Sequence, residues 1–341
     1  FYSEDSYPET DADLAKLKVE IEAFSKSCES KNKYLKFYST ANTAKDMDIL
    51  RAALGDKQLN FLGKSYGTYL GTLYANLFPN NVGRFVLDGA VDPTLNSTSQ
   101  SIQQAIGFDS AFKDFAADCM KQENCVFKSD PVLELTQKLN ELRLNPLSIG
   151  NRKLTESLAM YGVAFGLYDR ESGWPELRSA LKDLLAGDGK ALLKLSDIYT
   201  GRDSNGNYPT NEAESLSIIS CNDFPPTNTG KLQKNSSNSL FGKYVAYSDL
   251  DCNYLPHGRY QLISSKFEVK SPILIVGTTN DPATPYLWAQ KLSQVIKNST
   301  LLTLESDGHT GYNRGSACVD QVVEKYLISG VIPAGNTLCR S

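Results

Sequence analysis

The stretch Leu59-Asn60-Phe61-Leu62-Gly63-Lys64-Ser65-Tyr66-Gly67 decides the fold of this 341-residue chain. Residues 59–63 predict a short strand that ends in glycine, and residues 66–78 predict a helix that stops before Pro79. Residues 63–67 fit the pattern Gly-x-Ser-x-Gly, in which the serine occupies a sharp and strained turn between a strand and a helix. We therefore interpret Ser65 as a nucleophile, against the alternative of a tight turn that carries no chemistry.

The glycines around Ser65 have a steric explanation in this interpretation. Side chains two positions before and two positions after the serine would collide with neighbouring strands, which accounts for Gly63 and Gly67. Gly71 and Ala75 continue the series at four-residue steps and would let the helix lie close to the sheet. We expect the N–H of Tyr66 to be one of the two donors that an oxyanion needs, at a helix N-terminus that favours negative charge.

The elements around this turn predict a parallel sheet with crossover helices, because strands and helices alternate along the chain. Besides 59–63, the predicted strands are 84–89, 272–277 and 301–305. The helices predicted to accompany them are 10–27, 42–54, 286–297 and 317–328.

Helical segments dominate between the second and third of these strands. They are 101–121, 131–142, 154–169, 174–185 and 188–198, separated by polar loops. We predict an α/β fold in which residues 1–93 and 266–341 form the sheet core. Residues 94–265 are then an inserted helical cap, or lid.

The predicted nucleophile needs a base, which is usually histidine because its pKa lies near neutrality. The sequence contains two histidines. His309 lies in a glycine-flanked loop directly after the strand 301–305, whereas His257 precedes the strand 272–277. We predict that His309 is the base and that His257 is a surface or loop residue.

The base needs a carboxylate that fixes its tautomer and stabilises its cation. Asp281 follows the buried strand 272–277, in a loop stiffened by Pro282 and Pro285. The alternatives are that Asp281 only forms a turn before proline, or that Asp307 is the acid. Asp307 is too close to His309 in sequence to approach its far nitrogen easily. The order Ser65, Asp281, His309 is that of the α/β-hydrolase fold.

The sheet predicted here has fewer strands than the α/β-hydrolase fold normally has. Residues before 58 show helices and no strand signal. We therefore expect the N-terminal strands of the fold to be missing from this chain. The second oxyanion donor is then expected from an N-terminal segment of the same protein, which becomes a predicted partner.

Composition narrows the class of protein. A formal net charge of −4 and a pI of about 5.4 leave no basic field for nucleic acid or anionic lipid. The sequence contains no run of about 18 apolar residues, so we predict no membrane-spanning helix. With two histidines and no Cys-x-x-Cys pair, a zinc site is poorly supported, and we predict no metal and no cofactor.

The chain has seven cysteines, whose spacing suggests local disulfides in an oxidising compartment. The predicted pairs are Cys119–Cys125, Cys221–Cys252 and Cys318–Cys339. Cys28 is then left over and would need a partner outside this sequence. The alternative is seven buried, reduced thiols in a cytosolic enzyme.

Two runs, 62–71 and 85–93, resemble the secreted tripeptidyl aminopeptidases of actinobacteria, which are serine peptidases of the prolyl-aminopeptidase-like group. The motifs at 281–285 and 307–309, the tail from Cys318 to Cys339, and residues 174–175 and 221–223 are similar to the same family. The resemblance implies an exported exopeptidase, secreted or held in the cell envelope, that releases short peptides (tripeptides) from free N-termini through an acyl-enzyme.

The resemblance also implies that acidic groups of the lid hold the ammonium group of the substrate. Asp223 is the first candidate, and Glu171 and Glu176 follow it. The alternative for each is an acidic residue that is merely solvated.

Two other functions stay open. Relatives of the same form act as carboxylesterases or lipases with the same triad. A protein of another class, a non-catalytic binding protein with a hydrolase fold, would usually have lost a triad member, whereas candidates for all three are present here.

Overall fold

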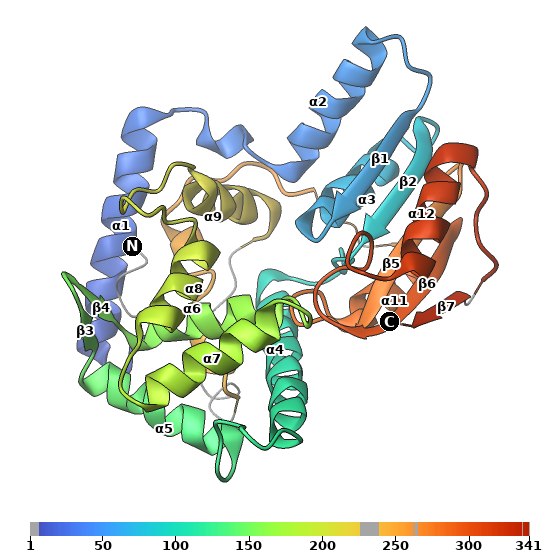
Figure 1. Ribbon diagram of the computed structural model, residues 1–341. Helices are drawn as coiled ribbons and strands as arrows, with labels where there is room; N and C mark the ends of the chain where they lie inside the picture. Colours follow the sequence, from blue (N-terminus) through green and yellow to red (C-terminus); the bar gives the residue numbers. More distant parts are fainter. Residues whose placement is uncertain (1–6, 226–238, 262, 264, 336, 341) are drawn as a thin grey trace.

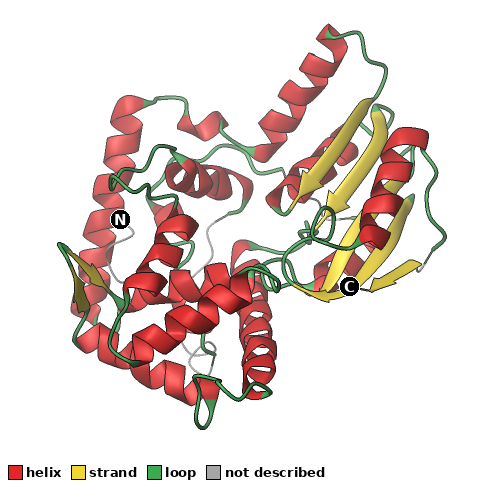
Figure 2. Ribbon diagram, in the orientation of Figure 1, coloured by secondary structure: helices red, strands yellow, loops and turns green. Residues whose placement is uncertain are grey.

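The computed structural model describes residues 7–225, 239–261, 263, 265–335 and 337–340. Figure 1 shows a sheet with its own helices on one side of the molecule and a larger helical part on the other. Figure 2 shows that the long strands all belong to the sheet part. The predicted α/β class is confirmed.

The sheet has five strands, all parallel, in the order β1-β2-β5-β6-β7. The strands are β1 Leu59–Lys64, β2 Val82–Asp88, β5 Ile273–Asn280, β6 Ser299–Asp307 and β7 Thr337–Arg340. Lys64 lies opposite Asp88, so β1 and β2 end level, and Asp88 lies opposite Val276, four residues before the end of β5. Because the strands are parallel, their carboxyl ends all point to the same edge of the sheet. Loops that follow these strands therefore meet at one edge of the sheet.

Helices cover both faces of this sheet (Figure 1). α3 (Tyr66–Leu77) and α11 (Tyr286–Val295) lie on one face, and α12 (Ala317–Ser329) lies on the other. The strand β5 is buried on both faces. Ile273 and Ile275 pack in the core with α3 and α11, whereas the residues that alternate with them pack in the core with α12. Burial on both faces explains the continuous apolar run from which the strand 272–277 is predicted.

The helical cap has a core of its own, in which side chains such as Phe112, Leu139 and Leu181 are fully buried. Its helices are α4 Ser97–Met120, α5 Pro131–Leu144, α6 Glu156–Leu167, α7 Gly173–Leu185, α8 Lys190–Thr200 and α9 Glu212–Asp223. α6 lies at the centre, and ten of its twelve residues are buried. A small hairpin, β3 Leu147–Ile149 with β4 Arg152–Leu154, lies beside these helices.

The N-terminal helix α1 (Asp11–Lys31) lies beside the cap rather than the sheet (Figure 1). Ser25 donates a hydrogen bond to the carbonyl of Tyr254 over 2.7 Å, and Glu9 forms an ion pair with Arg143 of α5. α2 (Thr40–Ala53) then leads the chain to α3 and the sheet. The predicted range 1–93 therefore groups α1 with a core that its described contacts do not reach, and the domain boundaries stay a prediction.

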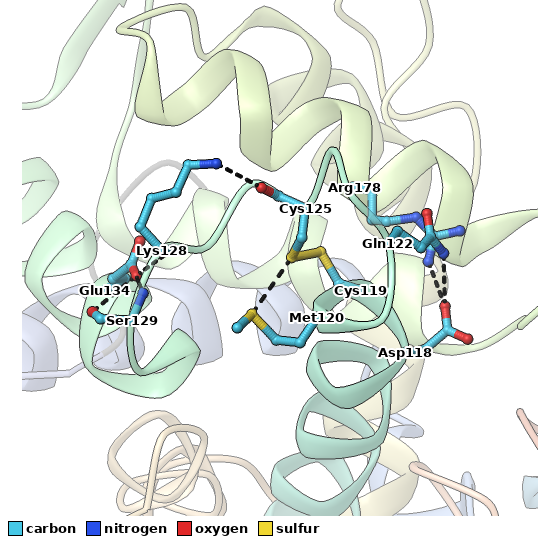
Figure 3. The surroundings of a disulfide bond; sticks show 9 residues. All are labelled: Asp118, Cys119, Met120, Gln122, Cys125, Lys128, Ser129, Glu134 and Arg178. Carbon is cyan, nitrogen blue, oxygen red and sulfur yellow. Dashed lines mark hydrogen bonds and ion pairs between the residues drawn. A yellow bond between two sulfur atoms is a disulfide. The ribbon is translucent and has the colours of Figure 1, made fainter.

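Three disulfides join the predicted pairs Cys119–Cys125, Cys221–Cys252 and Cys318–Cys339, so the predicted pairing is confirmed. Figure 3 shows the first of them closing the loop after α4. Asp118, beside this bridge, accepts a hydrogen bond of 2.8 Å from Arg178 of α7. Cys28 is a free thiol, and burial raises its pKa.

None of the described helices combines the length and the apolarity that crossing a bilayer requires.

The disulfide Cys318–Cys339 offers a test of how the edge of the sheet is held. It joins α12 to β7 across a sequence separation of 21 residues, and β6 is the one strand among the described residues that pairs with β7. We expect the double variant Cys318→Ala/Cys339→Ala to lose about 3 kcal/mol of unfolding free energy, because the cross-link restricts the unfolded chain. Denaturant unfolding measures this, with Cys28→Ala as the control. An equal loss in the control would contradict the prediction.

Candidate active site

The turn between β1 and α3 holds Ser65 in a strained backbone conformation. Its φ of 53° and ψ of −124° lie outside the regions that a residue with a side chain ordinarily adopts, at a cost of about 1–3 kcal/mol. The Ser65 N–H donates a hydrogen bond of 2.9 Å to the carbonyl of Asp88, at the end of the neighbouring strand β2. The predicted sharp turn is thus present, and it is anchored to the sheet.

The steric explanation of the glycines is correct in part. A Cβ on Gly63 would lie 2.4 Å from the carbonyl oxygen of Gly67, and one on Gly71 would lie 2.7 Å from a methyl carbon of Leu87. A Cβ on Gly67, however, would meet nothing within 4 Å. The predicted collision with a neighbouring strand is therefore wrong for both Gly63 and Gly67: a side chain at Gly63 would meet the backbone of Gly67 in α3. The prediction that Gly71 lets the helix lie close to the sheet is correct.

His309 and Asp281 form a buried pair. Nδ1 of His309 lies 2.9 and 3.0 Å from the two carboxylate oxygens of Asp281. Asp281 also accepts hydrogen bonds from the N–H groups of Ala283, Thr284 and Thr310 and from the Thr284 hydroxyl. A carboxylate held by so many donors fixes the proton on Nδ1 and leaves Nε2 with the lone pair that a base needs.

Ser65 follows β1 and His309 follows β6, and the end of β2 lies near both residues. Gly89 follows β2 directly, and a Cβ on it would lie 3.4 Å from Cε1 of His309. The same strand end accepts the hydrogen bond from Ser65. The hydrogen bonds of the described residues include none between the Ser65 hydroxyl and the imidazole. The structure therefore brings Asp281 and His309 together and places Ser65 on the turn after β1, and the complete triad stays a prediction.

The cap contacts the histidine directly. The His309 N–H donates to the carbonyl of Tyr168, just after α6, over 2.8 Å, and the two rings meet edge to face with centroids 5.2 Å apart. Asp307, the alternative acid, forms an ion pair with Arg170 and accepts a hydrogen bond of 2.9 Å from Asn280. The carboxylate of Asp307 thus joins the cap to the sheet, whereas that of Asp281 contacts the imidazole of His309.

A cavity of about 1050 Å³ opens between Ser65 and the cap. Its cap walls come from α6 to α9 and the loops between them. They combine aromatic and acidic side chains, among them Tyr168, Tyr199, Tyr208, Glu176, Glu212 and Glu214. Such a mixture suits an organic molecule that carries a positive charge.

Known proteins resemble this chain over nearly its whole length. The family model described as "TAP-like protein" matches residues 237–339, which include Asp281 and His309. Serine protease Hip1 of Mycobacterium tuberculosis (strain ATCC 25618 / H37Rv) is 34% identical over 96% of this chain and 66% of its own length. The chain belongs to the tripeptidyl aminopeptidase-like family.

Two further relatives of this chain are named for different activities. Tripeptidyl aminopeptidase of Streptomyces lividans is 28% identical over 98% of this chain and 64% of its own length. Carboxylesterase B of the same M. tuberculosis strain is 32% identical over 90% of this chain and 61% of its own length. The chain thus spans about two thirds of the length of the relatives it matches.

The residues expected to bind the substrate in this family differ in their surroundings. Asp223 is buried, and it accepts hydrogen bonds from the N–H and the hydroxyl of Thr40, at the start of α2, and from the hydroxyl of Tyr66. Glu176 is exposed and lines the cavity with Ser65, and Glu171 is exposed on the loop before α7. All three assignments stay predictions.

Further predictions concern Tyr66, His257 and metal binding. Tyr66 is the first residue of α3, where N–H groups have no partner within the helix. His257 lies exposed on a loop and stacks against Tyr260, with ring centroids 5.3 Å apart. In the described part of the chain, one group with the spacing of metal ligands occurs, around Cys221 and Cys252, and these two sulfurs form a disulfide.

Three residues that contact the site were not singled out from the sequence. Thr284 bonds Asp281, Tyr168 contacts His309, and Asp88 accepts hydrogen bonds from Ser65 and from the loop that follows His309. Thr284 had a signal in its position three residues after the acid, the distance at which a side chain folds back onto an aspartate turn. Tyr168 had none, because the contact joins segments 141 residues apart.

The pKa of Asp223 predicts a pH-dependent stability. Burial raises this pKa from 3.8 to about 6, so the folded protein binds the proton more tightly than the unfolded chain does. The unfolding free energy should therefore fall by about 3 kcal/mol through this group as the pH rises from about 4 to about 6. Asp223→Asn should remove that fall. Denaturant unfolding of both proteins at pH 4 and pH 7 tests this, and an unchanged difference between the two pH values would contradict it.

Proposed function

We propose that the protein is a serine exopeptidase that releases short peptides, namely tripeptides, from free N-termini through an acyl-enzyme. The observation that carries this proposal is the buried His309–Asp281 pair beside a strained serine turn, with the three predicted residues in loops at one edge of the sheet. The relatives named serine protease and tripeptidyl aminopeptidase support the choice of a peptide bond as the target.

The proposed cycle uses the chemistry of each group in turn. Nε2 of His309 takes the hydroxyl proton of Ser65 as the oxygen attacks the peptide carbonyl, and Asp281 stabilises the imidazolium that forms. The N–H of Tyr66 stabilises the oxyanion. His309 then gives the proton to the leaving amine, and water hydrolyses the acyl-enzyme by the same steps in reverse roles. No metal or cofactor is required.

We propose that acidic cap residues bind the ammonium of the substrate. Glu176 is supported by its place in the cavity wall that Ser65 also lines. Asp223 is supported by its contact with Tyr66, the residue next to the nucleophile, and Glu171 by its loop beside α7. An ammonium bound in the cavity at a fixed distance from Ser65 would limit the length of the released peptide.

We propose further that the protein acts outside the cytoplasm, secreted or in the cell envelope, since its three disulfides suit an oxidising compartment. An N-terminal segment of the same protein is the proposed partner of β1. This strand is an edge of the sheet, and Leu62 on it is exposed, although parallel strands are ordinarily covered on both sides. The same segment would supply the second oxyanion donor.

An esterase is the second candidate, favoured by the similarity to a carboxylesterase. It would use the same serine, histidine and aspartate on an acyl ester.

The assignment of nucleophile and base predicts a clear mutational pattern. Ser65→Ala should lower turnover by at least about 10⁴-fold, because no other group forms the acyl-enzyme, and should leave the unfolding midpoint almost unchanged. His309→Ala should do the same, whereas the control His257→Ala should keep wild-type turnover. A fluorophosphonate label located by mass spectrometry should lie on Ser65. Activity in His309→Ala together with its loss in His257→Ala would overturn the assignment.

The substrate class can be tested with three matched substrates: a tripeptide anilide with a free amine, its N-acetylated form, and a short acyl ester. We expect the free amine to be preferred. Glu176→Gln should lower kcat/KM for the free amine by about 10-fold and leave the acetylated substrate unaffected, because one charge interaction is lost. The exposed residue Glu123 provides the control, Glu123→Gln. Preference for the ester, with no effect of acetylation, would support the esterase instead.

A further inference from the structure

Asp88 is a carboxylate that the proposed cycle does not use. It is the last residue of β2, and its exposed fraction is 0%. Burial without a compensating cation in contact is unfavourable for a carboxylate, and it raises the pKa of Asp88 to about 6. Hydrogen bonds to its oxygens offset the desolvation of a buried carboxylate, so the donors that contact Asp88 are important.

Both oxygens of Asp88 bond the loop that carries His309. Oδ1 accepts from the N–H of Gly311 and Oδ2 from the N–H of Tyr312, each over 2.8 Å. The carbonyl of Asp88 accepts from the N–H of Ser65 over 2.9 Å. One residue therefore contacts the backbone of the nucleophile and the backbone just after the base.

The residue before the nucleophile contacts the same loop. The ammonium of Lys64 donates to the carbonyl of Tyr312 and lies 5.4 Å from the centre of its ring. The charges that face Asp88 are Lys64 from β1, which favours its ionised form, and Asp281 after β5, which opposes it. Tyr312 is thus held on its N–H by Asp88 and on its carbonyl by Lys64.

The remaining contacts of this loop do not reach Ser65. His309 bonds Asp281 and the cap, and Thr310, whose φ of 68° is strained, donates its N–H to Asp281. These contacts set the imidazole relative to the acid and the cap. The Asp88 and Lys64 contacts set it relative to the nucleophile.

We propose that Asp88 is a positioning residue, which holds the histidine loop at the distance from Ser65 that proton transfer requires. This inference rests on the proposed function, in which Ser65 and His309 react together. It assigns Asp88 no contact with substrate. A merely structural role would change the stability of the fold and leave the turnover of folded molecules unaltered.

The test is Asp88→Asn, which keeps the shape of the side chain but leaves one oxygen for two N–H donors. We expect kcat to fall by about 10- to 100-fold with KM within about twofold, because small displacements of reacting groups cost rate and not affinity. Labelling of Ser65 by a fluorophosphonate should slow by a similar factor. Amide hydrogen exchange at Gly311 and Tyr312 should become faster. The matched control is Asp109→Asn, a cap carboxylate that accepts from the N–H of Phe241 over 2.9 Å.

The readouts separate the two claims. If Ser65 of the wild-type protein takes no label, the proposed function fails, and hydrogen exchange still decides whether Asp88 holds the loop. Folded Asp88→Asn protein with wild-type kcat, labelling rate and amide protection would overturn the inference. If Asp88→Asn does not fold, amide hydrogen exchange of the wild-type protein replaces it. Exchange at Gly311 and Tyr312 as fast as at exposed loop amides would then overturn the inference, because the bonds to Asp88 would not be holding the loop.

Discussion

The strained backbone at Ser65 is the constraint on which the site depends. A residue with a side chain adopts a φ of 53° only when its surroundings hold it there, and here a hydrogen bond to the end of β2 and the close passage of Gly63 over Gly67 do so. The helix α3 can begin directly after the serine because Gly71 allows it to lie against Leu87 of the sheet. The turn, the helix and the neighbouring strand are therefore in close contact with one another.

Much of this arrangement could be predicted from the sequence, because it follows from short-range patterns. β5 has a continuous apolar run and the other long strands contain shorter apolar segments, and the helices that cross between them were predicted within a few residues of their observed ends. The elements that were missed are short or lack a pattern: β3 and β4 have three residues each, and β7 has four. α9 was missed because its apolar positions form no continuous stripe.

In the site, too, the features that follow from short-range patterns could be predicted, and those that depend on tertiary contacts could not. The pairing of Asp281 with His309 could be predicted because each follows a strand whose end meets the same edge of the sheet. Gly67 was assigned for the wrong reason, since its role in the turn depends on a backbone contact with Gly63 that no pattern of side chains displays. The placement of α1 beside the cap depends on pairs such as Ser25 and Tyr254, which lie 229 residues apart in the chain. Contacts of that kind are decided by the tertiary fold alone.

The contacts between the cap and the loop of His309 limit how the cap can move. An outward rotation of α6 would have to break the hydrogen bond from His309 to Tyr168 and separate Arg170 from Asp307. It would also remove an aromatic ring from the edge of the imidazole. The cap therefore cannot move away at the end of α6 without also disturbing the position of His309.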